Sequence, residues 1–344
     1  MQYEKYIQRC FQLALQGMGC VAPNPMVGCV LVANDVVIGE GFHEVYGGPH
    51  AEVNAFNSVK DQSLIPGATL YVNLEPCSHF GKTPPCADLI IEQGIKKVVV
   101  SNSDSNVLVA GKGIEKLKAA GVEVITGILA AEGKKLNKRF FTFHEKKRPY
   151  IILKWAQTQD GFISRFPVPE NSADNWITGE GCKKLVHQWR AEEDAIMIGT
   201  NTVLNDNPQL TTRLVKGKNP VRVVIDKKLM IPAGANIFNR EAKTIVFTEA
   251  EKTSHNNIEY IKTNFEENRI RFILTELQQR NISSLIVEGG AILLNSFIQQ
   301  NLWDEARVLV SGKTFGQGIQ APSFELNLND YTTVDGDQVF IVNN

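Results

Sequence analysis

A histidine, a glutamate and two cysteines have the residue types and the order that metal-assisted hydrolysis requires. Glu52 stands two residues after His50, and Cys77 and Cys86 follow an apolar run at 68–74. Imidazole and thiolate are ligands that suit zinc, and three protein ligands leave the fourth tetrahedral position open to water, as in catalytic zinc sites. We therefore predict that His50, Cys77 and Cys86 bind zinc.

Glu52 is placed to move protons beside this metal without being a ligand. Zinc lowers the pKa of bound water toward neutrality, and a nearby carboxylate can take the water's proton and pass it to a leaving amine. The signature of zinc deaminases is H-x-E followed by P-C-x-x-C, with the glutamate as acid and base. This chain departs from that signature, because the residues 78–85 separate its two cysteines.

A structural zinc site is the alternative, since His50 and the cysteines taken singly are also ordinary core residues. Structural zinc usually has four protein ligands. His79, between the cysteines, is the candidate for the fourth. That interpretation leaves Glu52 without a function, so it predicts a dispensable Glu52.

Helices and strands alternate around these residues, which is typical of an α/β layer fold. We expect a helix to begin near His50 and Cys77 to begin another, which would bring ligands from separate segments together. The other predicted elements are helix 3–17, strands 27–33 and 36–43 around the turn Asn34-Asp35, strand 68–74, helix 85–93, strand 96–101, helix 112–120, strand 122–126 and a helix near 130–140.

The apolar pattern breaks at 146–149 (KKRP), and the 344 residues exceed what one hydrophobic core usually fills. We therefore predict two domains, 1–145 and 146–344. The second domain also alternates helices and strands. Its predicted elements are a strand from 150, a helix after Thr178, strands 195–199, 221–226 and 244–248, helix 268–280, strand 284–288, helix 291–300 and strand 306–310.

Composition favours a small-molecule substrate. The net charge is −1 without a basic stripe, so a nucleic-acid deaminase with a C-terminal binding module lacks the basic groove it would need. The N-terminus has no signal-peptide pattern and no stretch is apolar enough to span a membrane, so we expect a cytoplasmic protein. A reducing compartment would keep the six cysteines as thiols.

The chain resembles the bifunctional riboflavin-biosynthesis deaminase/reductase family over nearly its whole length. The long intercysteine segment is that family's own form of the zinc motif. The matching segments are 22–28 (APNPMVG), 48–52 (GPHAE), 74–86 (LEPCSHFGKTPPC), 109–113, 136–137, 154–156 (KWA), 160–161, 176–178, Arg190, 199–213 (GTNTVLNDNPQLTTR) and 288–290 (EGG).

The resemblance implies a cytidine-deaminase-like α/β/α domain followed by a dihydrofolate-reductase-like α/β domain. The first would use one zinc ion to deaminate 2,5-diamino-6-ribosylamino-4(3H)-pyrimidinone 5′-phosphate hydrolytically. The second would use NADPH to reduce the ribosyl group to ribityl, giving 5-amino-6-ribitylamino-uracil 5′-phosphate. The resemblance also implies a homo-oligomer.

By position in these motifs, the resemblance places Asn24 against the deaminase substrate. Arg190, Leu210, Arg213 and Glu288 would contact the reductase substrate, and the two arginines can grip a phosphate through paired hydrogen bonds. The residues implied for NADPH are Ala156, Trp176, Thr202, Asp206, Gly290, Ala291, Ile292, Leu293, Leu294, Asn295 and Ser296.

Several of these residues have simpler interpretations from sequence alone. Arg190 could be a solvated helix charge, Trp176 a core residue and Asp206 the start of a turn. The segment 164–175 is longer than the family's usual connection, and Asp174 would repel a substrate phosphate, so we do not expect it to be a ligand. Lys227 and Lys228 could bind the 2′-phosphate of NADPH, or they could be ordinary surface lysines.

Overall fold

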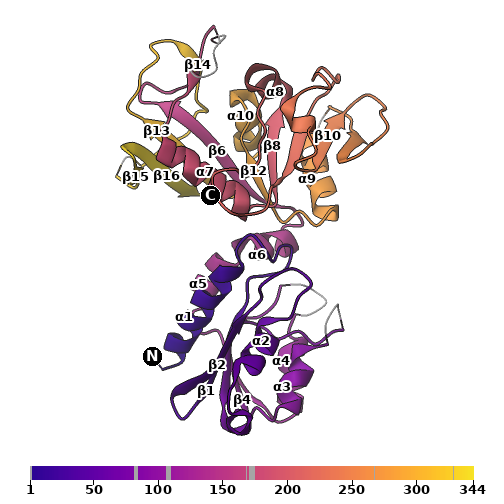
Figure 1. Cartoon of the computed structure of the whole chain (residues 1–344), viewed down its shortest axis with the longest axis vertical. Coiled ribbons are helices and arrows are strands. Elements are labelled where there is room, and N and C mark those ends of the chain that lie inside the picture. Colours follow the sequence, from indigo (N-terminus) through magenta and orange to yellow (C-terminus); the bar gives the residue numbers. More distant parts are fainter. Residues whose placement is uncertain are drawn as a thin grey trace. The chain divides into compact units, whose positions relative to one another are not determined.

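The computed structural model describes residues 2–80, 84–105, 110–167, 169, 175–266, 268–327 and 329–344. The chain forms two compact units, Met1–Lys147 and Arg148–Asn344 (Figure 1). Their junction lies within the KKRP segment, two residues after the expected boundary. Asp174 lies outside the described residues.

The sheet of the N-terminal unit has the strand order β2-β1-β3-β4-β5. β1 (Gly28–Ala33) runs antiparallel to β2 (Val36–Phe42) and to β3 (Thr69–Leu74), while β4 (Lys97–Asn102) and β5 (Glu123–Thr126) continue in parallel. Asn34 and Asp35 both have positive φ, 50° and 61°, as tight two-residue hairpin turns require. This is the hairpin predicted from sequence.

Both faces of this sheet are covered by helices (Figure 1). Every residue of β1 is buried: Cys29 and Leu31 pack into one core, and Val30 and Val32 into another with α1 (Gln2–Ala14). The first core is closed by α2 (Ala51–Ser58), α3 (Cys86–Glu92) and α4 (Lys112–Ala119). The predicted α/β/α arrangement is confirmed.

The single helix predicted near 130–140 is in fact two, α5 (Ala130–Leu136) and α6 (Lys138–Glu145). They meet at Asn137, whose buried amide accepts a hydrogen bond from the Met26 N–H (2.8 Å) and donates one to the Met26 carbonyl (2.9 Å). An asparagine held by a distant backbone ends the helix, which local propensity does not reveal.

The sheet of the C-terminal unit has the order β11-β10-β9-β8-β12-β6-β13-β16-β15. The strands from β11 to β13 pair in parallel and β16 and β15 are antiparallel, which confirms the predicted dihydrofolate-reductase-like fold. The strands are β6 (Tyr150–Thr158), β8 (Ala195–Gly199), β9 (Val221–Ile225), β10 (Thr244–Thr248), β11 (Ile258–Lys262), β12 (Ser284–Val287), β13 (Glu305–Ser311), β15 (Thr332–Val334) and β16 (Asp337–Asn343). Apart from this sheet, β7 (Phe162–Arg165) pairs with β14 (Gly318–Gln320).

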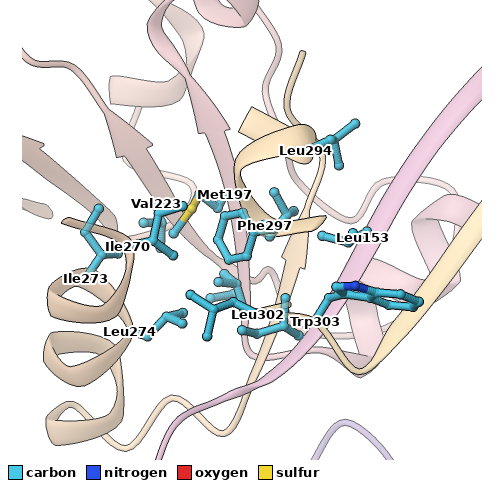
Figure 2. Close-up of a cluster of buried hydrophobic side chains, with 14 of the residues drawn as sticks. Leu153, Met197, Val223, Ile270, Ile273, Leu274, Leu294, Phe297, Leu302 and Trp303 are labelled. Carbon is cyan, nitrogen blue, oxygen red and sulfur yellow. The ribbon is translucent and has the colours of Figure 1, made fainter. Parts of the chain in front are cut away.

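Helices cover both faces of this sheet as well. α9 (Arg269–Gln279) and α10 (Ala291–Gln299) close the core drawn in Figure 2, where Leu274 and Phe297 face strand residues such as Met197. α7 (Glu180–Glu192) and α8 (Thr200–Asp206) close the opposite core. Among the helices of the described residues, none combines the length and hydropathy needed to cross a bilayer.

Candidate active sites

The three predicted zinc ligands converge in the N-terminal unit. His50 Nδ1, Cys77 Sγ and Cys86 Sγ lie within 4.8 Å of one another, with His50 Nδ1 3.3 Å from Cys86 Sγ and 3.6 Å from Cys77 Sγ. Tetrahedral zinc at ordinary bond lengths separates such donors by about 3.6 to 3.8 Å. The donor types and their spacing therefore fit a zinc ion.

Helix starts position two of the three ligands. His50 immediately precedes α2 and Cys86 is the first residue of α3, so the expectation that Cys77 begins a helix is wrong. Cys77 instead lies in the segment after β3, where the Cys86 N–H donates to its sulfur at 3.3 Å. The first amide of α3 thus stabilises the thiolate form of Cys77.

Hydrogen bonding distributes the protons of this cluster unequally. The hydrogen bond with Cys86, aided by His50, lowers the pKa of Cys77 well below that of a free thiol. The hydrogen bond between Cys86 and Cys77 raises the pKa of Cys86. A separate hydrogen bond between His50 and Cys77 raises the pKa of His50. Negative charge therefore concentrates on the Cys77 sulfur, which is one of the atoms that would bind a zinc ion.

Glu52 is buried beside the cluster, in the first turn of α2, with 3% of its surface exposed. Burial raises the pKa of its carboxyl, and the negative charge of Cys77 raises it further. A glutamate whose pKa moves toward neutrality is suited both to accept and to return a proton. Its surroundings fit the predicted role.

His79 is exposed and does not join this cluster, which within the described ranges holds His50, Cys77 and Cys86. A structural zinc site with four protein ligands would need such a fourth side chain. The three-ligand arrangement instead matches that of catalytic zinc sites.

Asn24 lies close to the cluster through a histidine that the sequence reasoning missed. The Asn24 amide nitrogen is 3.1 Å from His43 Nε2, and His43 Nδ1 is 2.9 Å from the Pro49 carbonyl oxygen. Since that carbonyl only accepts, Nδ1 carries the proton and Nε2 accepts from Asn24. The His43 ring is 5.5 Å from that of His50. The signal in the sequence was its place at the end of the predicted strand 36–43.

In the C-terminal unit, Arg190 of α7 and Glu288 at the end of β12 form a largely buried ion pair of 2.8 Å, with 12% and 11% of their side chains exposed. Lys154 of β6 lies 3.8 Å from the same carboxylate oxygen. Burial alone would raise the pKa of Glu288, but Arg190 and Lys154 hold it below its usual value. Arg190 is thus not a solvated helix charge. Lys154 was absent from the predicted site residues although its KWA segment was recognised.

Two atoms of this cluster have unmet hydrogen-bonding capacity. Glu288 Oε1 and Arg190 Nε are buried and have no hydrogen-bond partner among the described residues. Such atoms are costly unless a ligand satisfies them. They fit a polar substrate with hydroxyl groups.

Leu210 and Arg213 lie on a segment tied to the same helix. The Arg213 N–H donates to His187 Nδ1 at 3.0 Å, and His187 is buried one turn before Arg190. Leu210 is buried with a positive φ of 55°, whereas Arg213 is exposed. The loop main chain is therefore held by α7, while the exposed Arg213 guanidinium donates to the Thr211 hydroxyl of the same loop at 2.9 Å.

His187 should make the C-terminal unit acid-sensitive. Burial, with Arg190 and Arg213 nearby, lowers its pKa to about 4. Between pH 6.5 and 4 the unfolded chain binds a proton that the folded chain does not. The free energy of unfolding therefore decreases by up to about 3 kcal/mol as the pH is lowered through this range. Chaotrope unfolding followed by tryptophan fluorescence reports this unit, because all four tryptophans lie in it. His187→Asn should flatten the profile, and an unchanged slope in that variant would contradict the assignment.

The residues implied for NADPH gather at the carboxyl ends of neighbouring strands. Ala156 lies near the end of β6, Thr202 and Asp206 are in α8 after β8, and 290–296 begin α10 after β12. A Cβ on Gly290 would lie 3.9 Å from Thr202 Oγ1, so α8 and α10 are adjacent there. Crevices at this edge of a parallel sheet bind nucleotides, and a helix N-terminus favours phosphate.

The remaining members of the NADPH set differ in exposure. Trp176 is 49% exposed, which excludes the core interpretation. Ile292 is exposed, but the Leu294 side chain lies in the core (Figure 2). Within 290–296 the Leu294 side chain is therefore turned away from any ligand, whereas Asn295 and Ser296 are partly exposed. Lys227 forms an ion pair with Glu249 at 3.1 Å, in keeping with a surface lysine.

Family models match both halves of the chain. The model of the cytidine and deoxycytidylate deaminase zinc-binding region matches residues 1–102, and that of the RibD C-terminal domain matches residues 149–338. The riboflavin biosynthesis protein RibD of Aquifex aeolicus is 41% identical over 92% of this chain and 88% of its own length. That of Escherichia coli is 35% identical over 92% and 89%.

Solved structures match over nearly the whole chain. The diaminohydroxyphosphoribosylaminopyrimidine deaminase/5-amino-6-(5-phosphoribosylamino)uracil reductase of Thermotoga maritima has a TM-score of 0.88 and 39% identity, covering 99% of this chain and 98% of its own. RibD of Acinetobacter baumannii has a TM-score of 0.87 and 33% identity, with the same coverage.

Proposed function

The chain belongs to the RibD family, and from that premise we propose that its N-terminal unit is the deaminase and its C-terminal unit the reductase. The protein is a bifunctional enzyme of riboflavin biosynthesis that uses zinc and NADPH. It deaminates the ribosylaminopyrimidine phosphate hydrolytically and then reduces the ribosyl group to ribityl. The observation that carries the proposed division is the His50, Cys77 and Cys86 cluster beside buried Glu52.

In the deaminase, we assign His50, Cys77 and Cys86 as the zinc ligands. Zinc held there supplies an activated water at neutral pH. The Glu52 carboxylate takes a proton from the attacking water and returns it to the exocyclic amine, which leaves as ammonia. His43 accepts from the Asn24 amide nitrogen, and this fixes which way the Asn24 oxygen points toward the pyrimidine.

In the reductase, we assign Glu288 Oε1 to accept hydrogen bonds from ribose hydroxyls, since it is buried and unsatisfied among the described residues. Arg190 and Lys154 hold the carboxylate in place and keep it ionised. The exposed guanidinium of Arg213 binds the phosphate, and buried Leu210 shapes the loop that carries it. NADPH supplies the hydride. Ala156, Trp176, Thr202, Asp206 and 290–296 are assigned to hold it.

The decisive experiment measures the two reactions separately. The diaminopyrimidinone phosphate is supplied with and without NADPH, while ammonia release and NADPH oxidation are followed. We expect ammonia without NADPH, and NADPH oxidation only after deamination or when the deaminated compound is supplied. Ammonia release that requires NADPH would contradict the proposed assignment of the two reactions to the two units. An absence of NADPH oxidation with the deaminated compound would contradict it as well.

Arg213→Ala tests the phosphate contact. Losing a charge-assisted pair of hydrogen bonds should raise the KM of the reductase about 10- to 100-fold with little change in kcat. Lys216→Ala is the matched control, because Lys216 is exposed in the same loop. The KM for a dephosphorylated substrate should not change in Arg213→Ala. Equal KM increases with both substrates would place Arg213 elsewhere.

The substrate is a small molecule. We further propose that the protein acts in the cytoplasm as a homo-oligomer and binds neither nucleic acid nor membrane. The net charge of −1 supports the absence of a nucleic-acid partner. The family resemblance supports the oligomer.

A further inference from the structure

We propose that Glu75 is a positioning residue of the zinc site, which fastens the segment carrying Cys77 to the first turn of α4 and thereby fixes the Cys77 sulfur. This inference deepens the proposed deaminase site and rests on it. It concerns the one ligand that does not itself stand at a helix start. His50 and Cys86 stand at the beginnings of α2 and α3, whereas Cys77 follows β3 in an irregular segment.

Glu75 is buried, with 4% of its surface exposed, and its carboxylate accepts hydrogen bonds from four described backbone N–H groups. Oε2 accepts from Asp104 (3.1 Å) and Gly111 (3.0 Å). Oε1 accepts from Gly113 (2.9 Å) and Ile114 (3.2 Å). Burying a carboxylate is costly unless it is well paired, so this geometry is specified closely.

Two of these donors belong to the N-terminus of α4, which Glu75 caps from a different part of the chain. α4 begins at Lys112, and the preceding Gly111, with φ 78°, has no side chain to cap it. The first N–H groups of a helix have no partner within the helix. A carboxylate at that end satisfies them and interacts favourably with the helix dipole.

Gly113 brings the same helix turn against the next residue of the Cys77 segment. A Cβ on Gly113 would lie 1.9 Å from the Pro76 carbonyl oxygen. Only glycine permits this approach. The residues 75 and 76 are therefore both held by one turn of α4, which leaves the adjacent Cys77 little freedom. α4 contributes no predicted ligand, yet it supports one.

The alternative is that Glu75 only stabilises the N-terminal unit. Leu117→Ala provides the matched control, because Leu117 is fully buried in the hydrophobic core of the same helix but is not among the residues that donate to the Glu75 carboxylate. It should lower the unfolding temperature by creating a cavity while leaving Glu75 and Gly113 in place. Glu75→Gln, by contrast, keeps the shape but turns an amide N–H₂ toward backbone donors.

The test uses the full chain and measures zinc affinity by competition with a chromogenic chelator, the visible spectrum of the cobalt(II)-substituted protein, and both activities. We expect Glu75→Gln to bind zinc 10- to 100-fold more weakly, with altered cobalt bands, as when supporting residues of metal sites are lost. Ammonia release should fall correspondingly. NADPH oxidation with the deaminated substrate should not change.

Gly113→Ala should give the same phenotype with Glu75 intact. Alanine favours helix more than glycine does, so a loss cannot come from helix propensity. Leu117→Ala should change zinc affinity less than about threefold. Wild-type zinc affinity and cobalt spectrum in Glu75→Gln, or an equal zinc loss in an equally destabilised Leu117→Ala, would overturn the inference. Failure of the proposed function is distinguishable, since the unmodified chain would then release no ammonia or bind no zinc.

Discussion

Replacing Glu52 by glutamine is expected to abolish ammonia release while zinc content and NADPH oxidation remain those of the unmodified protein. The amide occupies the same volume in the first turn of α2 but cannot take a proton from water or return it to the amine. Loss of general acid–base catalysis costs about 10²- to 10⁴-fold in rate. Ammonia release in single-turnover experiments, with zinc measured on the same samples, gives the effect directly.

Glu44→Gln is the control for this experiment, because Glu44 is an exposed glutamate of the same unit outside the cluster. It should behave like the unmodified protein in both assays. A Glu52→Gln protein that retains zinc and releases ammonia within tenfold of the normal rate would remove Glu52 from the mechanism. The structural-zinc alternative would then regain support, because it predicts a dispensable Glu52.

Removal of a zinc ligand should have an effect of similar size with a different signature. Cys77→Ala deletes the thiolate on which negative charge concentrates, so we expect zinc to fall from one ion per chain toward none. Ammonia release should drop at least 10³-fold, since the activated water depends on the metal. NADPH oxidation with the deaminated substrate should persist. Metal analysis alongside both assays separates these outcomes.

Cys20→Ser controls for thiol loss in general, because Cys20 is exposed and outside the cluster. Chelation of the unmodified protein should reproduce the Cys77→Ala phenotype, and added zinc should reverse it. Added zinc should not restore Cys77→Ala. Full ammonia release from a metal-free protein would refute the proposed chemistry.

Local sequence features predicted much of the architecture. The hairpin at Asn34-Asp35 was predictable because those residue types tolerate positive φ, and β1 because it is apolar throughout. The break at Asn137 was not, since it depends on hydrogen bonds to Met26, 111 residues away. The C-terminal hairpin of β15 and β16 was also missed, although it is local: Asp335-Gly336, with φ 50° and 88°, forms its turn.

Residue types alone specify which atoms can bind the metal and which can move the proton, because donor chemistry belongs to the side chain. His50 and Glu52 are two residues apart, so their proximity is local. How Cys77 is held depends on the fold. Cys77 lies in an irregular segment and not at a helix start, and it is held by the first amides of α3 and, through Glu75, by the first turn of α4.

The reductase site depended even more on tertiary structure. Arg190 and Glu288 are separated by 98 residues and come together because α7 leads into β8, which pairs with β12. Burial between α7 and the end of β12 turns an ordinary helix arginine and a strand-end glutamate into an ion pair with unsatisfied atoms. Neither burial nor long-range pairing can be read from neighbouring residues, which is why Lys154 and His187 emerged only once the chain was folded.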